Sequence, residues 1–365
     1  MTNLKIKKLQ VTNFRNLESQ IISFSPKINC ILGENGNGKT NILEALFVLT
    51  YRKSFRKNTS FPQFLGIDGD KPEIYFNSVF EENTQGKLLT YSGKMDINGS
   101  AWFMNNEPTK KKIGAEIVFI NPFDSYSFNN IPAFRRKFFD DHLSIIDSAY
   151  KTVLNKYNSA LRFRNTLLSK KPSNYVEQIR VIDRQMASYS CELTTKRISF
   201  INDLVPLCEE IYRTIFSEEH ELKINLDSRF IGFSEDKIYD YMQSRLPKDD
   251  VVGHTTYQVH KDDYVLLFDG LNSYEFCSLG QQKMSYLSLL FAYIELFRVR
   301  FSTYPIVLID DVSGELDRVR WSRLIEFLEM RDFQVLITTA NEKFREELEK
   351  IEGSNKIYIE GGTIL

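Results

Sequence analysis

The sequence lacks a long hydrophobic run. No stretch approaches the roughly 20 uncharged apolar residues that a membrane-spanning helix needs. Residues 1–8 carry three lysines and do not form the apolar core of a signal peptide. These absences argue against an integral membrane protein, and we expect a cytoplasmic protein without a membrane partner.

Cysteine and histidine are also scarce. The chain has four of each, and none lies in a C-x-x-C pair or at the spacing of a zinc site. We therefore predict reduced, buried thiols rather than disulfides or zinc ligands. The cysteines are Cys30, Cys191, Cys208 and Cys277.

An excess of charge of one sign is missing too. The chain has 47 Lys and Arg against 48 Asp and Glu, so the whole molecule should not attract nucleic acid strongly, and any DNA binding must come from local basic patches. The 365 residues, 42% of them hydrophobic, can bury a large core in two domains or in one domain with an insertion.

The most informative stretch that is present covers residues 28–50. An apolar run at 28–32 predicts a buried strand, residues 33–40 fit G-x-x-x-x-G-K-T, and apolar residues at helical spacing follow. In this pattern, backbone N–H groups face a phosphate at the start of a helix. The alternative is an ordinary Gly/Asn turn. The predicted nucleotide-binding residues are Gly33, Glu34, Asn35, Gly36, Asn37, Gly38, Lys39 and Thr40.

Within this loop, Lys39 is expected to reach the β- and γ-phosphates of ATP, and Thr40 to ligate Mg²⁺. A second apolar strand, residues 305–309, ends in Asp310 and Asp311. We expect Asp310 to hold Mg²⁺ beside Thr40, and Asp311 to act with Lys39 in catalysis by orienting or deprotonating the attacking water. The alternative for the two acids is a helix N-cap with a solvated neighbour.

Residues 277–283 lead into an apolar helix predicted at 284–297. Its N-terminus offers Ser278, Gly280 and Gln281 as a second anion-binding surface. An S-x-G-Q motif shortly before an acidic strand is the order found in ATP-binding-cassette proteins. There the motif binds the γ-phosphate held by a partner subunit, which predicts a homodimer formed on ATP. Residues 313–317 resemble the D-loop of that interface and include Asp317.

A strand is predicted at residues 334–341, where many cassette ATPases place a histidine. Here Thr339 and Asn341 are the polar candidates and no histidine is available. We therefore predict slow hydrolysis.

The apolar pattern changes from period two to helical periods near Pro132 and stays helical to about Ser217. Apolar residues at 150–168 and 179–193 recur in steps of three and four, which predicts two antiparallel helices forming a short arm. Residues 3–33 are expected to form one small β-unit, with strands at 4–11 and 21–24 before the strand at 28–32. Further strands are expected at 73–76, 88–91, 117–120, 222–226 and 264–268.

The predicted fold class is therefore α/β: a P-loop ATPase head of the ABC type with a helical arm inserted. The head combines an α/β core with a β-sheet lobe at residues 72–121. The expected domains are a head of residues 1–130 and 219–365 and an arm of 131–218.

In this order, the motifs resemble the RecF family, bacterial recombinational-repair ATPases related to SMC heads. They lie at residues 13–16, 34–36, 54–56, 135–140, 155–168, 280–282 and 310–317. The chain departs from the family pattern at residues 258–263, where Gln-Val-His-Lys-Asp-Asp replaces Gly-Pro-His-Arg-Asp-Asp. It also has Leu279 in the signature and no glutamine at residues 120–124.

The resemblance implies an ATP-dependent dimer that binds double-stranded DNA and the single-strand/double-strand junctions of gaps. It also implies help to RecO and RecR in loading recombinase, links to replication and the SOS response, and a weak, DNA-stimulated ATPase. The basic residues that are candidates for DNA binding are Arg52, Arg56, Lys110, Lys111, Lys112, Arg135 and Arg136.

Alternatives remain for these basic residues and for the function. Lys110–Lys112 can equally be a solvated surface, and Arg135 and Arg136 can equally join the arm to the head by ion pairs. A scaffold with a structural nucleotide site is a second function. A transporter ATPase is disfavoured, because the arm separates the phosphate loop from the signature by more residues than such subunits have.

Overall fold

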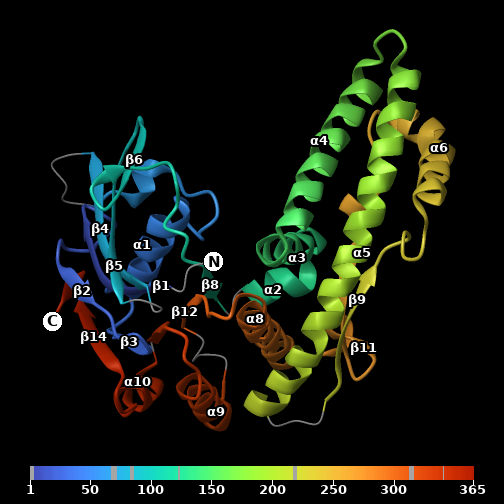
Figure 1. Cartoon of the computed structure of the whole chain (residues 1–365). Coiled ribbons are helices and arrows are strands. Elements are labelled where there is room, and N and C mark those ends of the chain that lie inside the picture. The colour runs from blue at the N-terminus through green and yellow to red at the C-terminus, as the bar shows by residue number, and fades with distance from the viewer. Residues whose placement is uncertain are drawn as a thin grey trace. The chain divides into compact units, whose positions relative to one another are not determined.

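The computed structural model describes residues 4–66, 72–82, 86–121, 124–216, 220–311, 316–339 and 341–365. The chain forms two compact units (Figure 1). The first comprises Met1–Asp124, Tyr212–Ser217 and Ile294–Leu365, and the second Ser125–Ile211 and Glu218–Tyr293. Across the described ranges, no helix is both long and apolar enough to cross a membrane.

The first unit contains a six-stranded sheet in the order β15-β14-β3-β13-β12-β8. All neighbours are parallel except β15, which runs antiparallel to β14. Every residue of β3 and β13 is buried, as in a parallel sheet covered on both faces. The strands are β3 (Ile28–Leu32), β8 (Ile117–Ile120), β12 (Ile306–Asp310), β13 (Val335–Thr339), β14 (Asn355–Glu360) and β15 (Thr363–Ile364).

Three helices accompany this sheet: α1 (Lys39–Tyr51), α9 (Arg318–Glu329) and α10 (Glu342–Glu349). Helix α1 packs against β12 and β13, and α10 against β3 and β13. Because the strands are parallel, β3, β12 and β13 end at one edge. That edge carries the phosphate loop and the acidic pair.

A second sheet of this unit is antiparallel, in the order β2-β1-β4-β5-β6-β7. Burial alternates along β1 and β4, as expected for a sheet with one face on the core. At Gly93 a Cβ atom would lie 2.3 Å from the Trp102 ring, so this position requires glycine. The strands are β1 (Leu4–Thr12), β2 (Ile21–Ser23), β4 (Glu73–Glu82), β5 (Lys87–Asp96), β6 (Gly99–Met104) and β7 (Glu107–Pro108), and a 3-10 turn, η1 (Phe61–Phe64), precedes β4.

The predicted strands are found, but two were placed in the wrong sheet. Residues 28–32 were grouped with the first two strands and 117–120 with the β-sheet lobe, whereas both belong to the parallel sheet. Sequence analysis also did not predict β6 and β7. Among the cysteines, Cys30 and Cys208 are buried as predicted, while Cys191 and Cys277 are partly exposed.

The second unit is mostly helical and has a three-stranded antiparallel sheet, β11-β10-β9. The two predicted arm helices are confirmed as α4 and α5, and α2 and α6 were missed. The elements are α2 (Asp124–Asn130), α3 (Pro132–Ile146), α4 (Ser148–Lys170), α5 (Tyr175–Phe216), β9 (Leu222–Asp227), α6 (Glu235–Val252), η2 (Val259–Lys261), β10 (Asp263–Phe268), β11 (Leu271–Asn272), α7 (Ser273–Phe276) and the beginning of α8 (Leu279–Phe301).

Residues 218–293 therefore fold together with residues 125–211. The division into a functional head (1–130 and 219–365) and arm (131–218) stays a prediction.

The motif at residues 258–263 packs inside this unit. Arg197 of α5 donates to the Val259 carbonyl (3.0 Å) and to Asp262 (3.2 Å), and His260 Nδ1 lies 2.9 Å from the Tyr157 hydroxyl. Burial lowers the pKa of His260 to about 4 and raises that of Asp262 to about 7. His260 and Asp262 thus join α4 and α5 to the start of β10.

Candidate functional site

The phosphate loop joins β3 to α1 and depends on its glycines. Gly36 and Gly38 have φ of 84° and 109°, in the left-handed region that glycine adopts readily. A Cβ atom on Gly33 would lie 2.3 Å from the carbonyl oxygen of Ile359, and one on Gly38 would lie 2.8 Å from Asn16 Oδ1. The loop therefore fits closely against β14 and the turn at Asn16.

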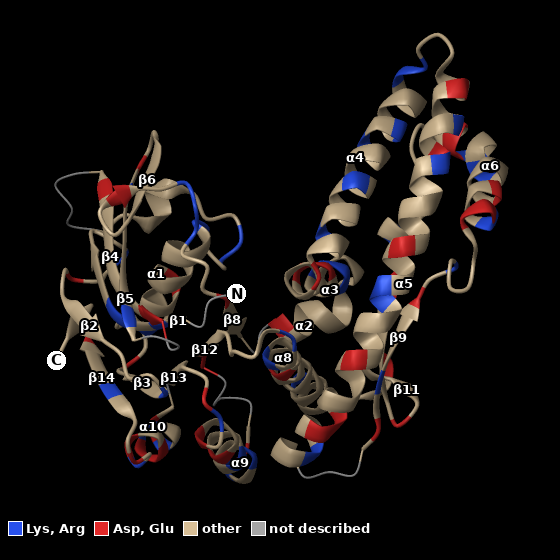
Figure 2. Cartoon of the chain, in the orientation of Figure 1, with Lys and Arg blue, Asp and Glu red and all other residues tan. Residues whose placement is uncertain are grey.

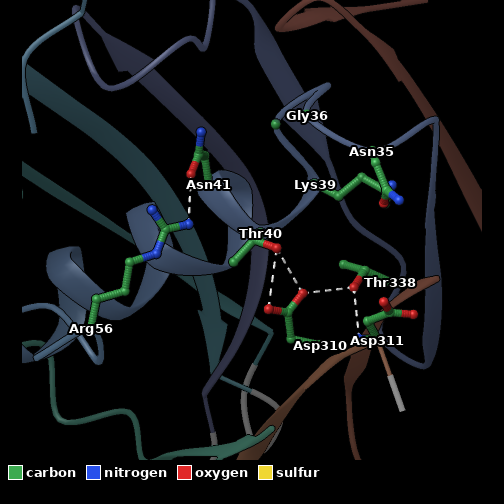
Figure 3. A pocket seen from close by; sticks show the side chains of 10 residues that line it. Asn35, Gly36, Lys39, Thr40, Asn41, Arg56, Asp310, Asp311 and Thr338 are labelled. Carbon is green, nitrogen blue, oxygen red and sulfur yellow. Dashed lines mark hydrogen bonds between the residues drawn. The ribbon is translucent and has the colours of Figure 1, made fainter. Parts of the chain in front are cut away.

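A pocket of about 190 Å³ opens over this loop (Figure 3). The structure brings the predicted loop residues and the acidic pair together there. Its lining residues are Asn35, Gly36, Gly38, Lys39, Thr40, Asn41, Arg56, Asp310, Asp311 and Thr338. The other predicted loop residues, Gly33, Glu34 and Asn37, line a neighbouring pocket of about 240 Å³ that also includes Arg345 and Tyr358.

The Lys39 ammonium group is folded onto its own loop. Nζ donates to the carbonyl oxygens of Gly33 (2.6 Å) and Glu34 (2.8 Å). Burial lowers the pKa of Lys39, and the charges of Asp311 and Asp310 oppose that shift. A bound phosphate could take over these hydrogen bonds and at the same time supply a negative charge to the buried cation.

Thr40 and Asp310 form the contact that joins the two halves of the site. Thr40 Oγ1 donates to Asp310 Oδ1 (2.9 Å) and Oδ2 (3.2 Å), and Thr338 Oγ1 donates to Oδ1 (2.8 Å). Burial raises the pKa of Asp310, while the two hydroxyl groups oppose the rise. A nearby cation would further favour the ionised carboxylate.

The oxygen atoms of Thr40 and Asp310 are of the kind that binds Mg²⁺. Magnesium is commonly held by one or two protein oxygens, with phosphates and water completing its shell. Thr40 and Asp310 supply such a pair. In the described part of the chain, no group of three or more His, Cys, Asp or Glu side chains is placed to hold a metal by itself.

Asp311 has a strained backbone. Its φ is 50°, which is uncommon for a residue other than glycine, and its N–H donates to Thr338 Oγ1 (3.1 Å). Its carboxyl group lines the pocket beside Asp310 (Figure 3). Backbone strain of this kind often accompanies functional sites, which agrees with the predicted role in positioning water.

Thr338 is a site residue that the sequence analysis missed. It pairs with Asp310 in the parallel register of β13 and β12. The predicted candidates on this segment are engaged elsewhere: Thr339 Oγ1 accepts from the Asn341 N–H (3.1 Å), and Asn341 caps α10. Only the strand register could have distinguished Thr338 from its neighbour.

Arg56, predicted as a DNA contact, lines this pocket. Its guanidinium donates to Asn41 Oδ1 (2.9 Å) and lies 3.4 Å from the buried carboxylate of Glu44. Glu44 also accepts two hydrogen bonds from Arg15 (3.0 and 2.9 Å) and one from Ser54 (2.6 Å). Glu44 therefore joins the motifs at residues 13–16 and 54–56 beside the phosphate loop.

The signature residues lie in the second unit, at the start of α8. Ser278 Oγ accepts from the Gln281 N–H (3.2 Å), and Gln281 Oε1 accepts from the Ser278 N–H (3.0 Å), which forms a capping box. Ser278 and Gly280 are exposed and Gln281 is partly exposed. The D-loop prediction at 313–315 lies outside the described residues, while Asp317 caps α9 by accepting from the Arg320 N–H.

The remaining candidates for DNA binding differ in accessibility. Arg52 donates to the carbonyl oxygens of Lys110 (3.1 Å) and Lys111 (2.7 Å) and lies 5.1 Å from the Trp102 ring centroid. It therefore fixes the backbone of this loop. The side chains of Lys110, Lys111 and Lys112 on the same loop are exposed.

Arg135 is buried and forms a bidentate ion pair with Asp263 (2.9 and 2.6 Å). Arg136 donates to the Asp262 carbonyl (3.1 Å). Arg135 is thus engaged within the second unit.

A family model described as the RecF/RecN/SMC N terminal domain matches residues 5–359. A protein named DNA replication and repair protein RecF from Agathobacter rectalis is 32% identical over 342 residues, with 91% of each chain covered. Another of that name, from Azobacteroides pseudotrichonymphae, is 30% identical over 369 residues, with 98% of each covered. The chain belongs to the RecF family.

The solved structures agree with a RecF-family fold. The recombination mediator protein RecF with ATP, from the RecFOR pathway, superposes with a TM-score of 0.83 at 24% identity, covering 100% of this chain and 98% of that one. The Smc head domain from Pyrococcus furiosus gives a TM-score of 0.59 at 15% identity, with 99% and 95% covered. The predicted α/β ATPase-head fold is confirmed.

Proposed function

We propose that this protein is a cytoplasmic, ATP-dependent DNA-binding protein of recombinational repair and replication restart. It dimerises on Mg-ATP and binds double-stranded DNA at gaps and single-strand/double-strand junctions, where it helps RecO and RecR load recombinase. The observation that carries the proposal is the Thr40–Asp310 contact of 2.9 Å, which joins the phosphate loop to the acidic strand. The name shared by the relatives, DNA replication and repair protein RecF, supports the biological setting.

In this proposal the residues of the pocket have separate tasks. The loop amides and Lys39 bind the phosphates, and Arg56 adds a guanidinium at the pocket wall. Thr40 and Asp310 hold Mg²⁺, which, when bound, neutralises phosphate charge. Asp311 orients the attacking water. No histidine stands on the described part of the segment 334–341, which supports slow turnover.

The exposed signature supports dimerisation. Ser278, Gly280 and the backbone at the start of α8 would form an anion-binding surface, and this surface would cap the γ-phosphate held by the other copy. Asp317 would lie at the same interface. The lysines of residues 110–112 would contact DNA phosphates, so that binding weakens as salt rises.

The proposal is tested by light scattering and gel shifts. The protein should be a monomer with ADP and a dimer with ATP and Mg²⁺, and it should shift gapped DNA more strongly with ATP than with ADP. A chain that stays monomeric with ATP would refute the proposed ATP-dependent dimerisation. No preference among blunt, gapped and single-stranded DNA would refute the junction role.

Asp310→Ala should remove the effect of Mg²⁺ on nucleotide binding. Because the variant keeps Lys39 and the loop, we expect weak ATP binding to persist while the gain in affinity from Mg²⁺ falls about tenfold or more, the size of losing one charged ligand contact. Titration of a fluorescent ATP analogue with and without EDTA measures this. Asp332→Ala, at an acid whose side chain is 82% exposed, serves as the control and should behave as wild type.

Asp311→Asn should separate dimerisation from turnover. The amide keeps the backbone hydrogen bond to Thr338 but cannot accept a proton, so ATP hydrolysis should fall about a hundredfold or more while the ATP dimer persists. Phosphate release with and without gapped DNA gives the rate. The second candidate function, a scaffold with a structural nucleotide site, is motivated by the engaged Thr339 and Asn341 and predicts neither DNA stimulation nor any effect of this change.

A further inference from the structure

The outward face of α4 is basic over its whole length. The helix contains five Lys and Arg residues and no Asp or Glu. Arg164 turns inward, whereas the other four are exposed. At 3.6 residues per turn, these four exposed cations fall within about 140° of the circumference of α4. Figure 2 shows blue bands and no red along this helix. The exposed cations are Lys151, Lys156, Arg162 and Lys170.

These four charges are not neutralised. Among the described residues, none of the four has an acidic oxygen within 4.0 Å, whereas Lys196 and Arg184 on the adjacent α5 pair with Asp147 (2.7 Å) and Asp236 (2.5 Å). Between the cations, α4 exposes neutral hydrogen-bonding side chains such as Asn155 and Ser159. The face therefore combines unpaired positive charge with uncharged donors, which is the mixture that contacts phosphodiester groups.

A groove runs beside this face between α4 and α5. It has a volume of about 470 Å³ and contains two aromatic side chains, Phe163 and Tyr189, together with polar groups of Asn155, Lys156, Ser159 and Gln185. Phe163 is 49% exposed. An aromatic ring accessible beside a row of cations offers a stacking surface for an unpaired base.

We propose that this α4/α5 groove binds single-stranded nucleic acid, with phosphates on Lys156 and Arg162 and a base against Phe163. Protein interfaces are depleted in lysine and serine, which disfavours an acidic protein as the occupant. Along a duplex each base is stacked between its neighbours, so away from its ends a duplex offers no base face to Phe163. The inference rests on the proposed function and deepens it, since it assigns a binding site to the single-stranded part of gapped DNA.

The test measures the affinity of the full-length protein for labelled oligothymidine without nucleotide, because the groove lies within one chain. Lys156→Ala/Arg162→Ala should weaken binding about tenfold and lower the slope of log affinity against log salt by about 1.4, at about 0.7 per lost contact. Phe163→Ala should weaken single-strand binding about fivefold or more and leave blunt duplex binding unchanged. The matched controls are Arg180→Ala/Lys248→Ala and Val181→Ala, at exposed positions of the same unit outside the groove.

The inference is overturned if the charge variants bind oligothymidine as wild type does, or if the control pair loses as much. It is also overturned if Phe163→Ala weakens duplex and single strand equally, or if polyglutamate competes as well as oligothymidine. ATP-dependent dimerisation, measured separately, tests the proposed function. A wild type that dimerises but does not bind oligothymidine therefore refutes only the groove.

Discussion

Lys39→Met is expected to lower ATP affinity about a hundredfold or more and to abolish ATP-dependent dimerisation. The ammonium group already reaches into the phosphate loop, where it donates to Gly33 and Glu34. Methionine keeps a stem of similar length but has no donor and no charge. Two charge-assisted hydrogen bonds to phosphate, worth about 1.5–3 kcal/mol each, are therefore lost.

Isothermal titration with ATP and Mg²⁺, followed by light scattering, measures both effects. Lys53→Met is the matched control, because Lys53 is an exposed lysine on the loop after α1 and should leave ATP affinity within about twofold of wild type. If Lys39→Met still dimerised with ATP, the ATP-dependent dimer would not depend on this phosphate contact.

Arg164→Ala is expected to destabilise the second unit by about 3–5 kcal/mol, the usual effect of removing one partner of a buried ion pair. Arg164 is fully buried and donates to Asp183 (2.6 Å), Asp249 (2.8 Å) and the Thr255 hydroxyl (2.8 Å). It therefore connects α4, α5 and the end of α6. Its removal leaves two carboxyl groups buried without their cation.

The loss should depend on pH. Burial already raises the pKa of Asp183, and Arg164 opposes that rise. Without Arg164, Asp183 binds a proton more tightly in the folded state than in the unfolded state. The stability of the variant therefore falls as pH rises from the unfolded pKa of Asp183 through its raised folded pKa. The destabilisation of Arg164→Ala should therefore be greater at pH 8 than at pH 5.

Urea unfolding with two probes tests this prediction. Both tryptophans, Trp102 and Trp321, lie in the first unit, so tryptophan fluorescence follows that unit. Far-UV circular dichroism is dominated by the longer helices of the second unit. The dichroism transition should move to lower urea. Arg162→Ala, two residues away on the exposed face, should change stability by less than about 0.5 kcal/mol. Equal stability of the two variants would contradict the proposed role of Arg164.

Much of the candidate site could be predicted because its motifs are contiguous. The phosphate loop needs glycines and consecutive backbone amides at the start of one helix, so residues 33–40 can be recognised from the sequence alone. Asp310 and Asp311 follow an apolar strand directly. In contrast, Thr338 enters the site through the register of β13 against β12, and Arg56 through Asn41 and Glu44. No sequence motif near Thr338 or Arg56 predicts these contacts.

The fold shows the same division. Helices α4 and α5 were predicted from the spacing of their buried residues, whereas α6 buries few side chains, among them Ile238, Met242 and Asp249, and has Pro247 in its interior, so its apolar pattern is weak. The assignment of β3 and β8 to the parallel sheet was not predicted either, because the residues of a short apolar strand do not indicate which strands it pairs with.

By itself, the sequence determined the phosphate loop, the acidic strand, the paired arm helices and the family, since each depends on residues close together in the chain or in a fixed order along it. Only the tertiary structure decided that Thr40 meets Asp310 and that Arg135 is buried on Asp263. It also decided that four exposed cations of α4, without an acidic partner among the residues described, lie beside a groove that contains two aromatic side chains. The physical reason is that hydrogen bonds and ion pairs between distant segments depend on strand register and helix packing, which local residue preferences do not specify.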